Sequence, residues 1–255
     1  MKGQSQPDDH ALVVGVAKYD PESNYQRLRG PPFDCRDFAQ WLVDDAGVPA
    51  KQVHSVVWSS SRTELYPNEG HIKSALRRVL YPNGALDPPG GRRLYLFSAG
   101  HCEASGTIDV DVVTAEANPP GLIASFPITH AAYLIRRSGL FREIVLFVDG
   151  CRSISSEQAL PYGLKLPRGP YDTQILYAFA CEHSRLAYEG IFGGRYRGVF
   201  SRALMQGLRG QAADGKKRIT GESLELFLHA RVTRLRAKGQ DQVPEIYCPK
   251  PFTLF

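Results

Sequence analysis

Short, continuous apolar runs alternate with amphipathic stretches along most of this chain. Apolar runs of this length, bounded by turn residues, are typical of strands that are buried on both faces of a sheet. Apolar residues spaced three and four apart instead predict helices with one buried face. We expect strands at 11–20, 53–58, 92–101, 143–151 and 174–180 with a final strand region in 243–255, and helices at 33–45, 71–81, 128–139, 198–208 and 222–237.

This alternation predicts a doubly wound, mostly parallel α/β sheet flanked by helices. No internal repeat, low-complexity tract or linker interrupts residues 1–255, so a single domain is expected. Residues 103–125 have an irregular pattern with room for a short hairpin. Residues 153–172 hold Gly and Pro without periodicity and are expected to form a loop, and the stretch GGRYRG at 193–198 has the character of a flexible loop.

Two of the expected strands end in residues that carry reactive groups. The third strand is followed by His101 and the fourth by Cys151. In open parallel sheets the functional crevice lies beyond the carboxyl ends of the strands, and consecutive strands are usually neighbours. We therefore expect the imidazole and the thiol at the same edge of the sheet. Taken alone, each residue would more often be structural, because a strand-end His is commonly a satisfied polar group and a buried Cys commonly fills a core.

Together, the two residue types match the requirements of a cysteine protease. An imidazole near a thiol raises its thiolate fraction and later protonates the leaving amine. The sequence here resembles the caspase and metacaspase clan, in particular the small prokaryotic caspase-like proteases, from Ala11 to Phe255. The resemblance rests on ALVVGVAKYD, LRGPPFDCRDFAQWL, LYLFSAGHC, IVLFVDGCRS, LAYEG, GVFSRALMQGL and QVPEIY, and on the 50-residue spacing between His101 and Cys151.

The resemblance implies a six-stranded, largely parallel sheet and a set of site residues. It makes Cys151 the nucleophile and His101 the general acid and base of an endopeptidase. It also implies an oxyanion hole formed by the backbone N–H groups of Cys151 and of the residue after the histidine. That residue is normally Gly in the family but is Cys102 here, which puts the local backbone conformation in question because Gly often adopts a positive φ.

Two carboxylates are expected to recognise the substrate. Asp149 shares a strand face with Cys151, since residues two apart on a strand point the same way. In metacaspase-like relatives the residues matching Asp34 and Asp149 form an acidic S1 pocket for Arg or Lys, whereas true caspases bind Asp there. The alternative for Asp34 is a carboxylate that interacts with the dipole at the start of a helix.

Composition indicates which partners, cofactors and cellular compartment to expect. The net charge of +5 is mild and has no long block of like charges, so nucleic-acid binding is not expected. The five cysteines contain no CxxC pair, no apolar run is long enough to span a bilayer, and no signal peptide is evident. We therefore expect a cytoplasmic protein with free thiols, no metal, no cofactor and no membrane association.

The expected partners are a protein or peptide substrate and an activating sensor protein, because relatives serve in prokaryotic immunity and cell death. The 153–172 loop separates the parts that resemble the large and small caspase subunits, and it offers Lys165 and Arg168 for self-cleavage. Two alternatives to a protease stay open. One is a caspase-fold adaptor that binds without cleaving, and the other is a small-molecule cysteine hydrolase on a flavodoxin-like sheet, which would need a small closed pocket.

Overall fold

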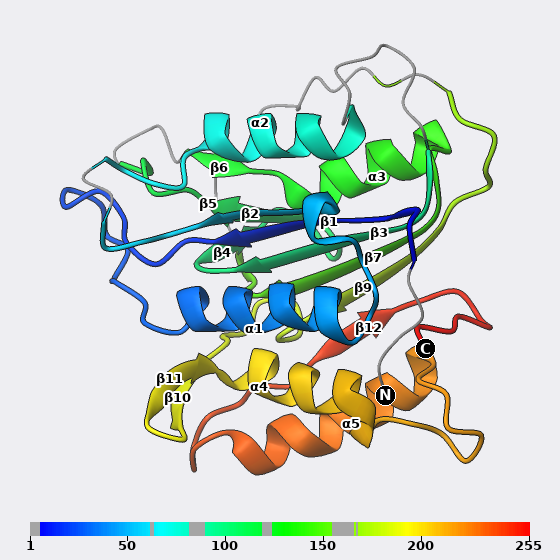
Figure 1. Cartoon of the computed structure of the whole chain (residues 1–255). Coiled ribbons are helices and arrows are strands. Elements are labelled where there is room, and N and C mark those ends of the chain that lie inside the picture. Colours follow the sequence, from blue (N-terminus) through cyan, green and yellow to red (C-terminus); the bar gives the residue numbers. More distant parts are fainter. Residues whose placement is uncertain (1–5, 62–63, 82–89, 119–123, 155–165, 167) are drawn as a thin grey trace.

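The structure is a computed structural model that describes residues 6–61, 64–81, 90–118, 124–154, 166 and 168–255. Its centre is a six-stranded sheet with the order β12-β9-β7-β3-β1-β2 (Figure 1). Five of these strands run parallel and β12 is antiparallel to β9. The strands are β1 (Asp9–Gly15), β2 (Val53–Val57), β3 (Gly91–Ala99), β7 (Phe141–Asp149), β9 (Gln174–Phe179) and β12 (Glu245–Tyr247).

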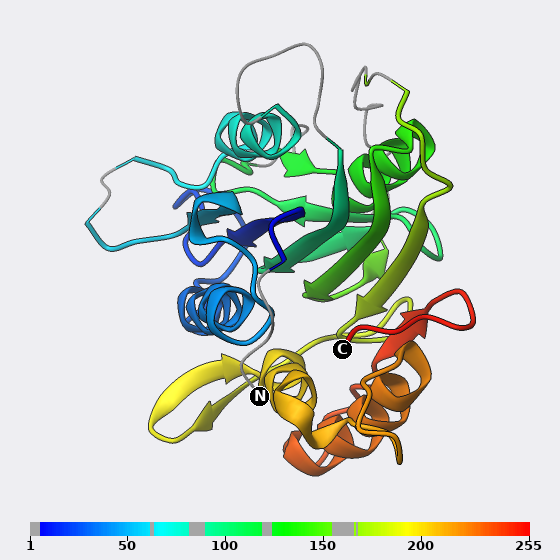
Figure 2. The same ribbon diagram turned by 45° about the vertical axis from the view of Figure 1, so that its right-hand side comes forward.

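Helices cover both faces of this sheet. The helices α2 (Glu69–Leu80) and α3 (Ile128–Ser138) lie on one face, and α1 (Pro31–Asp44), α4 (Val199–Gln206) and α5 (Gly221–Leu235) lie on the other (Figures 1 and 2). Each face has its own core of buried side chains. Ile72 and Leu76 belong to the first core, and Phe38 and Trp41 belong to the second. The predicted doubly wound α/β architecture is therefore confirmed.

The irregular stretch 103–125 contains an antiparallel hairpin, for which its pattern left room. It contributes β4 (Cys102–Ala104) and β5 (Val110–Val113) to a second sheet with the order β6-β5-β4-β8. The other two strands are β6 (Ser125–Phe126) and β8 (Ser153–Ile154). These strands are too short to show a periodic pattern, and the pairing of β4 with β8 joins segments about 50 residues apart.

Two expectations need correction. The stretch GGRYRG is not a flexible loop, because β10 (Glu189–Phe192) and β11 (Arg195–Gly198) form an antiparallel hairpin. Gly193 and Gly194 have φ angles of 60° and 76°, as a two-residue type I′ turn requires. Of the final strand region expected in 243–255, only β12 forms, and Thr253 makes an isolated bridge with Thr220.

The segment 153–172, which was expected to form a loop, is described only in part. Residues 155–165 and 167, including Lys165, lie outside the described residues, whereas Arg168 is exposed. The single-domain boundary at 1–255 stays a prediction. In the described part of the chain, none of the helices has the length and apolar character needed to cross a bilayer.

Candidate active site

The ends of the two central strands bring the predicted His and Cys together. In the parallel pairing of β3 with β7, Ala99 lies opposite Asp149. The chain continues for two residues beyond each strand end, which puts His101 and Cys151 on the lining of one pocket of about 60 Å³. Both side chains are half-buried. The position of this pocket at the carboxyl edge of the sheet follows from the parallel topology.

The imidazole of His101 is held by the segment that follows β1. Its Nε2 lies 2.9 Å from the backbone oxygen of Gln26. A carbonyl oxygen only accepts hydrogen bonds, so we infer that Nε2 carries the hydrogen and Nδ1 is left as the proton acceptor. Burial is the main reason why the pKa of His101 lies below its ordinary value. The imidazole is therefore neutral near pH 7 and available as a base.

Two tyrosines fix the surroundings of this imidazole. The hydroxyl of Tyr19 accepts the backbone N–H of His101 at 2.8 Å, and its ring centroid lies 5.0 Å from that of the imidazole. The ring centroid of Tyr25 lies 5.3 Å away, and its hydroxyl donates to Glu103. Sequence analysis missed the Gln26 carbonyl, for which no sequence signal exists, and also both tyrosines, although Tyr19 lies within one of the motifs quoted above.

The thiol of Cys151 contacts both backbone polar groups of one residue, Ala187. Sγ accepts the N–H of Ala187 at 3.4 Å and lies 3.7 Å from the oxygen of the same residue. Burial raises the pKa of Cys151, and the Ala187 N–H opposes that rise. The site therefore rests as a neutral thiol beside a neutral imidazole. A nucleophilic attack by this sulfur would require transfer of its proton to a base such as Nδ1.

Cys102 stands where the family that the sequence resembles has Gly. Its backbone does not adopt the left-handed conformation. Among the described non-glycine residues, only Ser184 and Lys217 have positive φ angles. Cys102 begins β4, opposite Val112, and the N–H of Val113 donates to the oxygen of His101. Because hydrogen bonding alternates along an antiparallel ladder, the Cys102 N–H points away from β5. A backbone donor is thus retained, and the buried Cys102 side chain packs beneath Gly150.

Asp34 and Asp149 line the same pocket as Cys151. Asp34 accepts the N–H of Gly198 at 2.8 Å and forms an ion pair with Arg197. Asp149 accepts the N–H of Ser201 at 3.0 Å. The alternative role for Asp34, a carboxylate that interacts with the dipole of its own helix, stays open, because Asp34 lies in the first turn of α1 while its oxygens also bind the β10–β11 hairpin.

A third carboxylate, which sequence analysis did not assign, completes this acidic pocket. Glu189 lines the pocket and accepts the N–H of Gly30 at 2.6 Å. It lies within the LAYEG motif, so the signal was present but its position relative to the two aspartates was not readable. We use "acidic pocket" below for Asp34, Asp149 and Glu189.

Burial changes the charge of the acidic pocket near neutral pH. It raises the pKa of Asp34 to about 8, with a further rise from the charge of Asp149. Burial also raises the pKa of Asp149 to about 6, against the opposing hydrogen bonds from Ser201. Near neutral pH Asp34 therefore holds a proton, although the guanidinium of Arg197 and the N–H of Gly198 favour its charged form. A cationic side chain would favour release of that proton.

Gly198 provides the close approach that the acidic pocket needs. A Cβ at this position would lie 1.9 Å from Oδ2 of Asp149. We expect Gly198→Ala to destabilise the protein by about 1–3 kcal/mol, because the hairpin and β7 must move apart. Urea unfolding is the measurement, with Gly215→Ala as the control because no atom lies within 4 Å of a Cβ there. Equal midpoints for the two variants would contradict this account of the pocket.

A known protein is similar to this chain in sequence. No protein-family profile matches the chain. It is 25% identical over 271 aligned positions to a protein of a Desulfuromonadales bacterium named as a probable protease. That alignment takes in 92% of this chain and 31% of the other protein, so the chain spans about a third of the length of its curated relative.

Two solved structures have a similar fold. Caspase-1 from Spodoptera frugiperda superimposes with a TM-score of 0.61 at 13% identity, covering 96% of this chain and 90% of the caspase. A Geobacter sulfurreducens protein superimposes with a TM-score of 0.59 at 16% identity, covering 94% of this chain and 93% of the other. The chain therefore has the caspase-like fold that its motifs predicted.

Proposed function

We propose that this protein is a cysteine endopeptidase that cleaves after Arg or Lys. The observation that carries the proposal is the acidic pocket beside a thiol and an imidazole at one sheet edge. A basic side chain in this pocket would form charge-assisted hydrogen bonds with carboxylates. The probable-protease name of the longer relative supports the same reaction class.

Each step of the reaction has a group suited to it. Nδ1 of His101 takes the proton from Cys151 as Sγ attacks the scissile carbonyl carbon. The backbone N–H groups of Cys151 and Cys102 donate to the oxyanion that forms. His101 then protonates the leaving amine, which leaves a thioacyl-enzyme. Water hydrolyses this intermediate with His101 acting again as the base.

The two alternatives account for fewer of these features. A non-catalytic adaptor has no need for an imidazole whose Nε2 is fixed by Gln26 and whose Nδ1 is left free. A small-molecule hydrolase needs a closed cavity, whereas the 60 Å³ pocket adjoins a much larger groove through Leu28, which lines both. Cleavage of a peptide library by the purified protein is the direct test, and a protein inactive on every peptide would favour the adaptor.

We expect the preference for Arg to grow with pH. Below about pH 6 both Asp34 and Asp149 are protonated, and between about pH 6 and pH 8 they acquire charge. The ratio of kcat/KM for a peptide with Arg before the scissile bond to that for its citrulline twin should rise over this range. Titration of the thiol and the imidazole affects both peptides equally, so it cancels in this ratio. A ratio independent of pH would contradict the charge-based pocket, and Asp34→Asn should shift the rise to lower pH.

The biological setting proposed with this activity is intracellular. The protease would act in the cytoplasm on a protein substrate, under the control of a sensor protein, in immunity or cell death. This part of the proposal follows only from the sequence resemblance. Detection of substrate fragments in cells that carry the wild-type gene, but not in cells that carry Cys151→Ala, would test it.

A further inference from the structure

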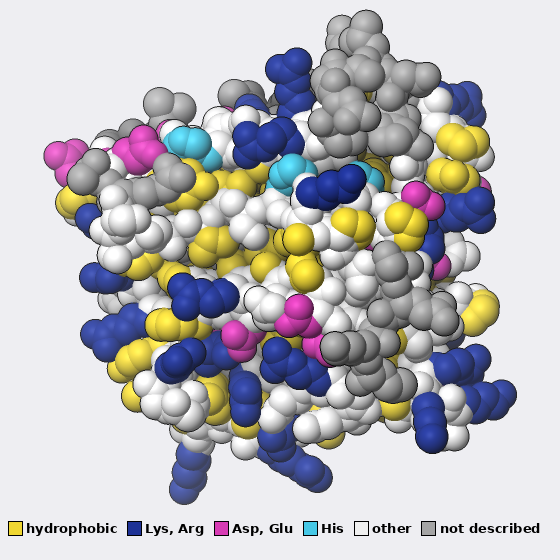
Figure 3. All heavy atoms as spheres, in the orientation of Figure 1, with side chains coloured by type: hydrophobic (Ala, Val, Ile, Leu, Met, Phe, Trp, Pro, Cys, Tyr) yellow, Lys and Arg dark blue, Asp and Glu magenta, His cyan; other side chains and the backbone are white. Residues whose placement is uncertain are grey.

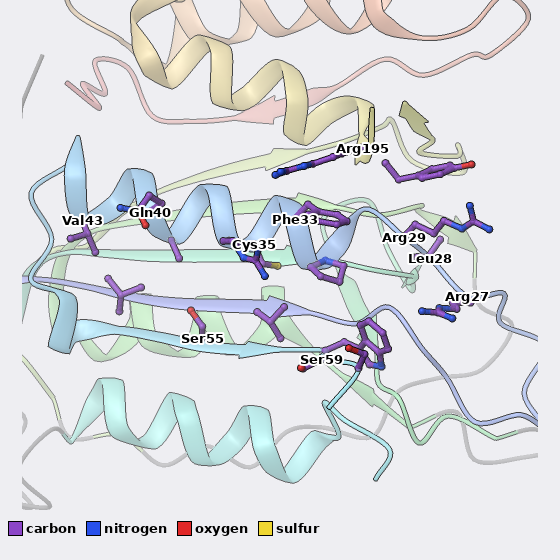
Figure 4. Close-up of a pocket in the computed structure, with 18 of the residues that line it drawn as sticks. Arg27, Leu28, Arg29, Phe33, Cys35, Gln40, Val43, Ser55, Ser59 and Arg195 are labelled. Carbon is purple, nitrogen blue, oxygen red and sulfur yellow. The ribbon is translucent and has the colours of Figure 1, made fainter. Parts of the chain in front are cut away.

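A groove of about 1090 Å³ lies between α1 and the edge strand β2, outside the acidic pocket (Figure 4). Its apolar lining comes from both elements, with Val43 on α1 and Val53 and Val57 on β2. In Figure 3, hydrophobic patches are exposed near the middle of this face, and Lys and Arg side chains lie at its left as well as along its other edges. We call this feature the arginine groove, after the four exposed guanidinium groups that line it: Arg27, Arg29, Arg36 and Arg195.

The positive charge of the arginine groove has no carboxylate within the groove to balance it among the residues that the structure describes. Across the described part of the chain, no carboxylate forms an ion pair with any of the four arginines. Three of them stack on aromatic rings instead, which orients a guanidinium without neutralising it. The ring contacts are Arg27 over Trp58 at 5.1 Å, Arg29 over Tyr196 at 4.7 Å and Arg195 over Phe33 at 5.7 Å.

The strand along this groove has an unpaired side. β2 ends the six-stranded sheet, with β1 as its one strand neighbour. The N–H of Trp58 donates to the backbone oxygen of Gly15, the last residue of β1. Because backbone direction alternates along a strand, the N–H groups of Ser55 and Val57 point away from β1. An exposed row of this kind is a template for a further strand.

The groove and the acidic pocket are neighbours that share a wall. Leu28 lines both of them. The next two residues, Arg29 and Gly30, donate their N–H groups to Glu189 in the acidic pocket. One extended polypeptide can therefore occupy the groove and present a bond to Cys151.

We propose that the arginine groove binds an extended acidic segment of the protein substrate, which adds to the sheet beside β2. The inference rests on the proposed protease function, since it names a second substrate-recognition surface. A peptide uses all three properties of the groove: carboxylates meet the four guanidinium groups, alternate apolar side chains meet the valines, and the main chain meets the edge of β2. A nucleic acid would use the charge and the aromatic rings but neither the valines nor the edge of β2.

Binding is measured separately from catalysis. Full-length Cys151→Ala is titrated with a fluorescein-labelled octapeptide of alternating Glu and Val, and anisotropy is followed at low and high salt. We expect saturable binding that weakens with salt. The twin with Gln in place of Glu, and the twin N-methylated at every second residue, should each bind roughly tenfold weaker or worse. Equal binding of all three peptides, or tighter binding of single-stranded RNA of the same charge, would overturn the proposal.

Charge reversal in the groove provides the matched variants. Arg36→Glu with Arg195→Glu, made in the Cys151→Ala protein, should weaken peptide binding roughly tenfold or more. The control reverses two exposed charges near the end of α5, Arg234→Glu with Lys238→Glu, and should retain the original affinity. Equal losses in the two pairs would indicate a non-specific effect of net charge and overturn the site. Circular dichroism establishes that both proteins are folded.

Cleavage by the wild-type protein links the groove to the substrate. A short peptide with a central Arg is compared with versions that carry the Glu-Val segment before or after it. We expect one of the two extensions to lower KM severalfold with little change in kcat. Cleavage of all three with one KM would refute the groove as a substrate site while the protease assignment stands. Absence of cleavage in all three would refute the protease assignment, and the anisotropy result would then decide the acidic-peptide site alone.

Discussion

Cys151→Ala is expected to reduce kcat/KM for an Arg-containing peptide by roughly 10⁴- to 10⁶-fold, and His101→Ala by a similar factor. The losses should be far from additive in the double variant, because the thiol and the imidazole act in one step. Replacement of Cys151 leaves an alanine beside Ala187, so the unfolding midpoint should change little. His101→Ala opens space between the rings of Tyr19 and Tyr25, and a modest loss of stability is expected there.

The control for this experiment is Cys248→Ala, which removes a half-buried thiol far along the chain from the acidic pocket. It should retain full activity. A peptidyl fluoromethyl ketone with Arg at its reactive end should label wild type and Cys248→Ala but not Cys151→Ala. Near-normal cleavage by Cys151→Ala would refute the nucleophile assignment. A wild-type protein that neither cleaves nor reacts would instead support the adaptor.

The second large effect is the choice of residue before the scissile bond. Arg should be preferred over Asp by roughly 100-fold or more, since an acidic side chain would meet up to three carboxylates in a partly desolvated pocket. Arg should also exceed Lys where its planar group contacts two carboxylate oxygens. Hydrolysis of matched fluorogenic peptides at pH 8 measures both ratios. Faster turnover of the Asp peptide would group this chain with the true caspases.

A single substitution isolates the electrostatic part of this preference. Asp149→Asn keeps an oxygen that can accept the Ser201 N–H but removes the charge. We expect kcat/KM for the Arg peptide to fall roughly 30-fold or more, which corresponds to at least ~2 kcal/mol, while the citrulline peptide changes much less. Asp44→Asn, at the other end of α1 from Asp34, is the matched control. Equal losses on both peptides would mean that Asp149 acts through local structure rather than charge.

Local patterns were sufficient to predict the six-stranded sheet and the edge at which His101 and Cys151 lie. Continuous apolar runs predicted β1, β3 and β7 because strands buried on both faces leave no room for polar alternation. The residues just past β3 and β7 predicted the placement of His101 and Cys151, because parallel strands deliver their carboxyl ends to one edge. The periodicity of α1 and α2 was readable for a similar reason, since one buried face imposes apolar spacing. Each of these signals lies within about ten consecutive residues.

Only the tertiary structure determined what surrounds these groups. The proton-accepting nitrogen of His101 depends on the Gln26 carbonyl, and a backbone oxygen leaves no mark in a sequence. Glu189 joins the two aspartates because the β10–β11 hairpin folds back onto the start of α1, about 160 residues away. The groove over β2 likewise arises from segments that meet only after folding. A sequence reports the burial and periodicity of neighbouring residues, whereas pKa shifts, pocket walls and unpaired charges depend on which distant segments share one low-dielectric space.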